Sequence, residues 1–138
     1  MLTKGGHINK LAFIQNKMKQ EETTIWRAIF LDKIEDLCLE HFGCHWTKNE
    51  NFAYGINFLY NDISENKRKG DKMFLFKTIV VQNQIDLDST KRSNLEHPDE
   101  EEYVLKPNIY LKKVILVNRG NESTEFSVNT GNRYDNWI

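Results

Sequence analysis

The sequence predicts a single α+β domain in which one or two helices near the N-terminus pack on antiparallel strands. Two segments of the first 42 residues carry apolar side chains at helical spacing, whereas period-two alternation and continuous apolar runs dominate from residue 52 onward. Helices followed by strands are typical of α+β domains rather than of alternating α/β folds. No repeat, low-complexity tract or linker divides the 138 residues, so we expect residues 1–138 to share one core.

The two predicted helices lie at residues 7–20 and 32–42. The first segment repeats its apolar residues near helical spacing before a polar stretch. The second begins at Asp32, an N-cap residue, and has Glu35 three positions later, as in a capping box. Gly43 follows it and can end the helix.

Six segments are predicted as strands. Residues 25–30 are apolar apart from Arg27, which is typical of a short buried strand, and residues 52–60 alternate bulky with small side chains up to Asn57. The other four predicted strands are 72–81, 102–105, 108–117 and 123–128. Segment 82–99 has turn residues and no sustained period, so we expect a loop there.

Composition limits the kind of partner. The chain has 19 Lys and Arg against 20 Asp and Glu, so its net charge provides no overall attraction to nucleic acid or to an anionic membrane. No segment approaches the roughly 20 apolar residues of a spanning helix, and residues 1–13 lack the apolar core of a secretory signal. Two cysteines are too few for a disulfide scaffold. We expect an intracellular protein, nuclear or cytoplasmic, that binds a protein partner rather than a membrane.

RNA is an alternative partner, and it would need a local basic patch. Lys67, Arg68, Lys69 and Lys72 form one short basic loop. Four cations near one turn could contact phosphate, although a solvated hairpin tip is the simpler interpretation of such a loop.

Six motifs follow one another in an order that is known from one protein family. They are INKLAFIQN (8–16), IWRAI (25–29), IEDLCLEHFGCHW (34–46), FAYGINF (52–58), KMFLFKTIVVQ (72–82) and EYVLKPNIYLKKVILV (102–117). In this order they resemble the catalytic domain of the poly(ADP-ribose) polymerase (PARP) family, the diphtheria-toxin-like ADP-ribosyltransferases. The hydrophobic pieces look closest to small mono-ADP-ribosylating members such as the zinc-finger antiviral type. The resemblance covers about residues 8–118 and leaves 119–138 as a tail.

The resemblance implies a shortened ADP-ribosyltransferase fold, a pair of antiparallel sheets with NAD in the cleft between them. In the family, a His bonds the nicotinamide ribose, a Tyr stacks on nicotinamide, and a Glu polarises a ribose hydroxyl. The corresponding catalytic positions hold Arg27, Asn57 and Glu102. Ala28 replaces the glycine that follows the His, and Ser64 lies one place from a serine that assists binding. The implied NAD-binding residues are therefore Arg27, Ala28, Asn57 and Ser64.

Two of these replacements oppose the family's chemistry. Cleavage of the glycosidic bond of NAD passes through a cationic, oxocarbenium-like state, which acceptors and a carboxylate stabilise. The guanidinium of Arg27 is always charged and would repel both the nicotinamide and the developing positive charge. Asn57 lacks an aromatic face, a loss of about 0.5–1.5 kcal/mol of stacking. The favoured interpretation is a pseudoenzyme, a PARP-like binding or regulatory module with a degenerate NAD site and no cofactor.

Two alternatives stay open. In the first, the chain is an active NAD-dependent mono-ADP-ribosyltransferase that uses Arg27 and Glu102 to modify protein side chains, with NAD as its substrate. In the second, it is a small zinc-stabilised interaction domain, since four side chains of the types that zinc prefers lie within eight residues. These four are Cys38, His41, Cys44 and His45. Their spacing differs from the paired signatures of zinc sites, so no metal ligand is assigned.

Overall fold

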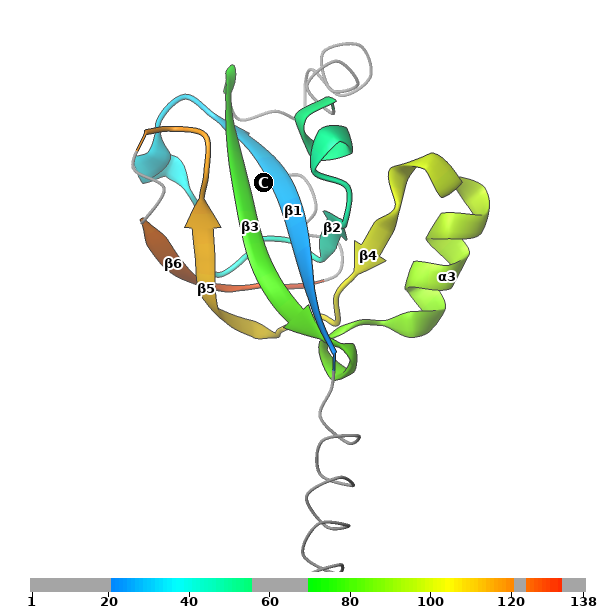
Figure 1. The fold of residues 1–138 in the computed structure, drawn as a ribbon. Coiled ribbons are helices and arrows are strands. Elements are labelled where there is room, and N and C mark those ends of the chain that lie inside the picture. Colours follow the sequence, from blue (N-terminus) through cyan, green and yellow to red (C-terminus); the bar gives the residue numbers. More distant parts are fainter. Residues whose placement is uncertain (1–20, 56–69, 121–123, 133–138) are drawn as a thin grey trace, which may run out of the picture.

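The computed structural model describes residues 21–55, 70–120 and 124–132. These residues form one six-stranded antiparallel sheet with the strand order β4-β2-β1-β3-β5-β6 (Figure 1). In chain order the strands are β1 (Glu22–Leu31), β2 (His45–Thr47), β3 (Lys72–Val81), β4 (Glu102–Val104), β5 (Tyr110–Leu116) and β6 (Glu125–Asn129). The helical elements with defined bounds are α3 (Leu87–Glu96) and three short 3₁₀ turns, at Ile34–Asp36, Gln82–Gln84 and Pro98–Glu100. The predicted α+β class is confirmed.

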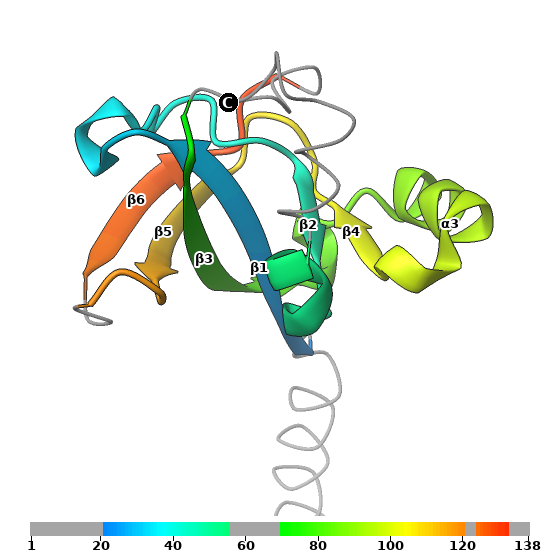
Figure 2. The same cartoon turned by 90° about the horizontal axis from the view of Figure 1, so that it is seen from above.

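Strands β1 and β3 form the centre of the sheet. They pair over ten positions, from Glu22 opposite Val81 to Leu31 opposite Lys72. Both strands are rich in β-branched and aromatic residues, which suit a pleated surface. Seen from above, β5 and β6 lie on one side of this pair, and β2 and β4 lie on the other (Figure 2). The resemblance implies a pair of sheets, whereas the described strands belong to one continuous sheet.

The sheet curls, because the segment that leads into β2 also contacts the end of β6. The amide of Phe42 donates to the carbonyl of Asn129 at 3.0 Å, and the amide of Asn129 donates to the carbonyl of Leu39 at 2.7 Å. Since residues 39–43 continue directly into β2, they connect one side of the sheet to its far edge. The backbone groups at the end of β6 are thereby satisfied, and the core is enclosed.

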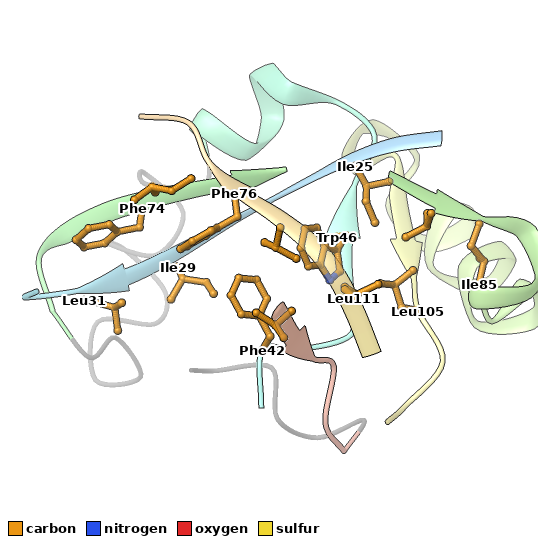
Figure 3. Close-up of a cluster of buried hydrophobic side chains, with 14 residues drawn as sticks. Ile25, Ile29, Leu31, Phe42, Trp46, Phe74, Phe76, Ile85, Leu105 and Leu111 are labelled. Carbon is orange, nitrogen blue, oxygen red and sulfur yellow. The ribbon is translucent and has the colours of Figure 1, made fainter. Parts of the chain in front are cut away.

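Aromatic rings fill the interior of the curled sheet (Figure 3). Phe42 stacks on Trp46 of β2 with ring centroids 5.5 Å apart and meets the edge of Phe76 of β3 at 5.0 Å. Phe76 in turn contacts Phe126 of β6 at 5.8 Å. Each pair of this kind contributes about 0.5–1.5 kcal/mol beyond the burial of its area. The rings therefore link β2, β3 and β6 across the core.

Helix α3 covers the outer edge of β4. The amide of Val104 donates to the Thr90 hydroxyl at 3.0 Å, and the side-chain amide of Asn94 donates to the carbonyl of Glu102 at 2.9 Å. The helix has no buried residue, so polar contacts of this kind hold it to the strand. They stand where a further strand would otherwise pair, and they protect the edge.

Two predicted elements are wrong in the described residues. Instead of a helix over 32–42 there is one 3₁₀ turn at Ile34–Asp36, because Leu39 and Phe42 form hydrogen bonds with Asn129 of β6 and Phe42 lies in the core. Residues 50–55 are helical, although 52–60 was expected to be a strand; the part of that expected strand at 56–60 lies outside the described residues. Asn49 caps this helix by accepting a hydrogen bond from the amide of Phe52 at 3.1 Å. Local capping thus outweighs the period-two pattern.

The expected loop at 82–99 is also wrong, because it contains α3. Asp86 is the N-cap residue, and its carboxylate accepts a hydrogen bond from the amide of Ser89 at 3.0 Å. The helix lacks an apolar period because it buries no face. The predicted helix at 7–20 lies outside the described residues. In the part of the chain that the structure describes, every helix is too short or too polar to cross a membrane.

Candidate functional site

Arg27 lies on the core side of β1, between Ile25 and Ile29. Its side chain is only 8% exposed, and its Nη1 donates to the carbonyl of His45. Alternation along the strand explains the inward direction, since Ile25 and Ile29, two residues away on either side, are both buried in the core. The position that the resemblance assigns to a ribose-binding His therefore holds a buried cation.

Gly43 provides the space for this guanidinium. A Cβ at Gly43 would lie 2.7 Å from both Cζ and Nη2 of Arg27, closer than Cβ contacts in proteins allow. The glycine also has φ +106°, which L side chains rarely adopt. The close approach and the backbone conformation both require glycine here, so its role is to accommodate Arg27 and not to end a helix.

Ala28 points away from Arg27. It is half-buried on the other face of β1 and lies opposite Leu75 of β3. Successive side chains of a strand alternate between the two faces of its sheet. The side chains of Arg27 and Ala28 therefore do not line one common surface.

Glu102 begins β4, and protein groups contact both of its carboxylate oxygens. Nδ1 of His45 lies 2.8 Å from Oε2, and the hydroxyl of Ser93 in α3 donates to Oε1. The side chain of Glu102 is 21% exposed and that of His45 is 33% exposed, so the cluster is partly open to solvent. The carboxylate thereby joins three elements, β2, β4 and α3.

Electrostatics keep this carboxylate ionised. Burial alone would raise the pKa of Glu102, but the hydrogen bonds of His45 and Ser93, together with electrostatic interactions with His45 and Arg27, outweigh burial and hold the pKa below its usual value. Among the causes that lower this pKa, the charge of Arg27 is the smallest. We name Arg27, His45, Ser93 and Glu102 the Glu102 cluster.

His45 and Ser93 are the members of the cluster that sequence reasoning did not assign to this site. His45 appeared only among the zinc-type side chains, and Ser93 lay in a segment that was expected to be a loop. Two signals in the sequence bear on them. The pattern of His45 and Thr47 suits one face of a strand, and Asp86 can act as an N-cap for a helix that contains Ser93.

Of the other predicted site residues, Ala28 lies on the opposite face of β1 from Arg27. Asn57 and Ser64 lie outside the described residues. Of the zinc-type side chains, Cys44 is buried with its Sγ 3.9 Å from the carbonyl of Lys106, whereas Cys38 is only half-buried. Within the described ranges, no group of three His, Cys, Asp or Glu side chains could hold a metal ion.

The chemistry available to the Glu102 cluster is limited. An ionised carboxylate with an adjacent imidazole can accept hydrogen bonds and stabilise positive charge. The serine hydroxyl donates to the carboxylate, so it is not arranged as a nucleophile activated by the histidine. The contacts instead suit a polar cluster that fixes the register of β2 and β4 and the position of α3.

Comparisons of the chain with protein-family models, with curated proteins and with solved structures found no match.

Proposed function

We propose that this chain is a PARP-like domain with a degenerate NAD site, and that it acts as a binding or regulatory module and not as an ADP-ribosyltransferase. The main support is the environment of Arg27. Its guanidinium is buried against Gly43 and bonded to the backbone of His45, at the position where the family places its ribose-binding His. A protein is the expected partner of such a module.

A buried guanidinium at this position opposes catalysis for two reasons. It carries a permanent charge, which disfavours the cationic nicotinamide and the oxocarbenium-like transition state. Its hydrogen bond to the His45 carbonyl also has a structural use, since that carbonyl would lose a partner if Arg27 moved toward a ligand. Both effects favour a structural role for Arg27.

The environment of Glu102 supports the same conclusion. In the family, the corresponding carboxylate polarises a ribose hydroxyl. Here one oxygen accepts from Ser93 and the other contacts His45, so both oxygens already have protein partners. A ligand hydroxyl would compete with bonds that hold β4 to α3 and β2.

The ADP-ribosyltransferase architecture is part of this proposal. We infer that the two sides of the curled sheet correspond to the family's pair of sheets, with β5 and β6 on one side and β2 and β4 on the other. The space between them holds Phe42, Trp46 and Phe76, which pack against one another. A filled interior favours a module without an open NAD cleft there.

Isothermal titration with NAD tests the proposal. We expect no binding heat beyond dilution at NAD concentrations up to about 1 mM, which corresponds to a binding free energy weaker than about −4 kcal/mol. An active PARP catalytic domain in the same buffer serves as the positive control. Micromolar binding that Arg27→Ala or Glu102→Ala abolishes would overturn the proposal.

One observation favours the alternative, an active mono-ADP-ribosyltransferase. Glu102 is kept ionised and lies within electrostatic reach of Arg27, as a carboxylate acting on ribose would need to be. Incubation of the chain with biotinylated NAD and a cell extract measures transfer directly. Labelling that depends on Glu102, compared with the Glu102→Gln variant, would favour the enzyme, and equal background in both would favour the module.

A further inference from the structure

A groove lies on the face of the sheet that points away from the core. It has a volume of about 690 Å³, and β1, β3 and β5 contribute most of its lining. The lining residues that matter here are Glu22, Thr24, Lys77, Ile79, Tyr110 and the pair Lys112 and Lys113. None of them belongs to the Glu102 cluster, so the groove is separate from the residues that the proposed function concerns.

A β-bulge in β5 turns two adjacent lysines toward this groove. Leu111 and Val114 are both in the core although they are three residues apart, and the pairing of β5 with β6 shifts register between them. Regular alternation would direct Lys113 inward, but the extra residue leaves Lys112 and Lys113 both exposed. The hydroxyl of the buried Thr78 donates to the carbonyl of Lys113 at 2.9 Å and holds the bulge in place.

The groove combines positive charge with exposed apolar surface. Lys77 of β3 adds a third cation, and Glu22 is the one acidic residue of the lining. Tyr110 is 57% exposed and Ile79 is 56% exposed, which is high for side chains of this size. The whole chain has a net charge of −1, so this positive charge is a local feature. Cations beside an exposed aromatic ring on a sheet are the elements that bind phosphates and stack unpaired bases.

We propose that this groove binds single-stranded RNA, with the lysines at the phosphates and Tyr110 stacked on one base. Stacking on Tyr110 requires a base whose face is free, which excludes a paired duplex. The carboxylate of Glu22 and the hydroxyl of Thr24 lie along the same groove and can accept a hydrogen bond from a ribose 2′-hydroxyl, which DNA lacks. A strongly acidic peptide would satisfy the lysines but would have no base to stack on Tyr110.

Fluorescence anisotropy with the full chain tests this proposal. The probe is a fluorescein-labelled oligouridylate of about 12 nucleotides, within the usual site size of single-strand binding proteins. We expect micromolar binding that weakens with salt. The double variant Lys112→Glu with Lys113→Glu should weaken it at least about tenfold and lower the salt slope by about 1.4, because each phosphate contact on a single strand contributes about 0.7. Tyr110→Ala should weaken binding about 5- to 160-fold, because stacking contributes about 1–3 kcal/mol per base.

The matched control is Lys91→Glu with Arg92→Glu. These two adjacent exposed cations lie on α3, so their reversal changes the net charge by the same amount as the groove variant. We expect the control to bind within about twofold of wild type. Melting curves by circular dichroism verify that each variant folds, and Tyr110→Ala, which removes an exposed side chain, tests the groove independently of the lysines.

Four outcomes would overturn the proposal. The first is the absence of wild-type binding at about 100 μM, the weak end of non-specific affinities, and the second is equal weakening of binding by the two double variants. The third is DNA of the same length and base content that binds as tightly as RNA. The fourth is a poly-glutamate peptide that competes as effectively as RNA at equal charge.

Discussion

The contact between Gly43 and Arg27 predicts a large effect of Gly43→Ala. A Cβ would lie 2.7 Å from Cζ of Arg27, at a residue with φ +106°. The backbone of Gly43 is held on both sides, since its amide donates to the carbonyl of Thr130 at 2.9 Å and its carbonyl accepts from the indole of Trp46 at 3.1 Å. The guanidinium is held by the carbonyl of His45. Neither group can move without losing a hydrogen bond.

The expected cost has two parts. An alanine at positive φ costs about 1–2 kcal/mol, and displacement of a packed side chain costs about 1–3 kcal/mol more. We therefore expect Gly43→Ala to lower the free energy of unfolding by about 2–5 kcal/mol, measured by urea denaturation with circular dichroism. In an Arg27→Met background the second part disappears, so Gly43→Ala should cost only about 1–2 kcal/mol. The double-mutant cycle should give a coupling of about 1–3 kcal/mol.

Gly120 provides the matched control. It also has a positive φ, +97°, but no atom lies within 4 Å of the position of its Cβ. Gly120→Ala should therefore cost about 1–2 kcal/mol and show no coupling with Arg27→Met. If Gly43→Ala and Arg27→Met were additive within about 0.5 kcal/mol, the guanidinium would not lie against Gly43, and the main support for a degenerate NAD site would be lost.

Two further predictions concern β4 and α3. Folding lowers the pKa of Glu102, so its contribution to stability is complete above the unfolded value of about 4.3 and is lost as the pH falls through the folded value. Glu102→Gln should lower the free energy of unfolding by about 1–2 kcal/mol at neutral pH and make stability less sensitive to acid. The control is Glu96→Gln, on the exposed part of α3, which should leave the acid sensitivity unchanged. Urea denaturation repeated from about pH 6 to about pH 3 measures both variants. Asp86→Ala removes the N-cap acceptor of α3 and should lower the free energy of unfolding by about 1 kcal/mol. Asp86→Asn retains an acceptor and should lower it by less than half of that amount. Equal losses of stability in thermal melts would show that the cap hydrogen bond contributes nothing.

Most of the strands can be predicted from local sequence patterns. Three predicted strands are runs of β-branched and aromatic residues. Segment 25–30 lies within β1, segment 72–81 coincides with β3, and segment 108–117 includes β5. Such patterns indicate which faces of a strand are buried, because they depend only on the order of apolar and polar side chains within the segment. The apolar run also identified Arg27 as the one charged residue of segment 25–30.

Contacts between distant segments explain the elements that local patterns describe poorly. Residues 32–42 have a helical period, yet Leu39 and Phe42 form hydrogen bonds with Asn129 of β6, and Phe42 is buried. Helix α3 has no apolar period because it binds the edge of β4 through polar side chains such as Thr90. In both cases hydrogen bonds to distant backbone outweigh the local preference.

The Glu102 cluster shows the same division. The motifs of the resemblance assigned Arg27 and Glu102 to one predicted site by their positions in the chain. The antiparallel pairing of β2 with β4 brings His45 to Glu102, and the packing of α3 against β4 adds Ser93, although 57 and 9 residues separate these side chains from Glu102 in the sequence. Sequence patterns identify which side chains must be buried or charged, whereas strand pairing across the fold decides which of them meet, because contacts between distant segments leave no local period.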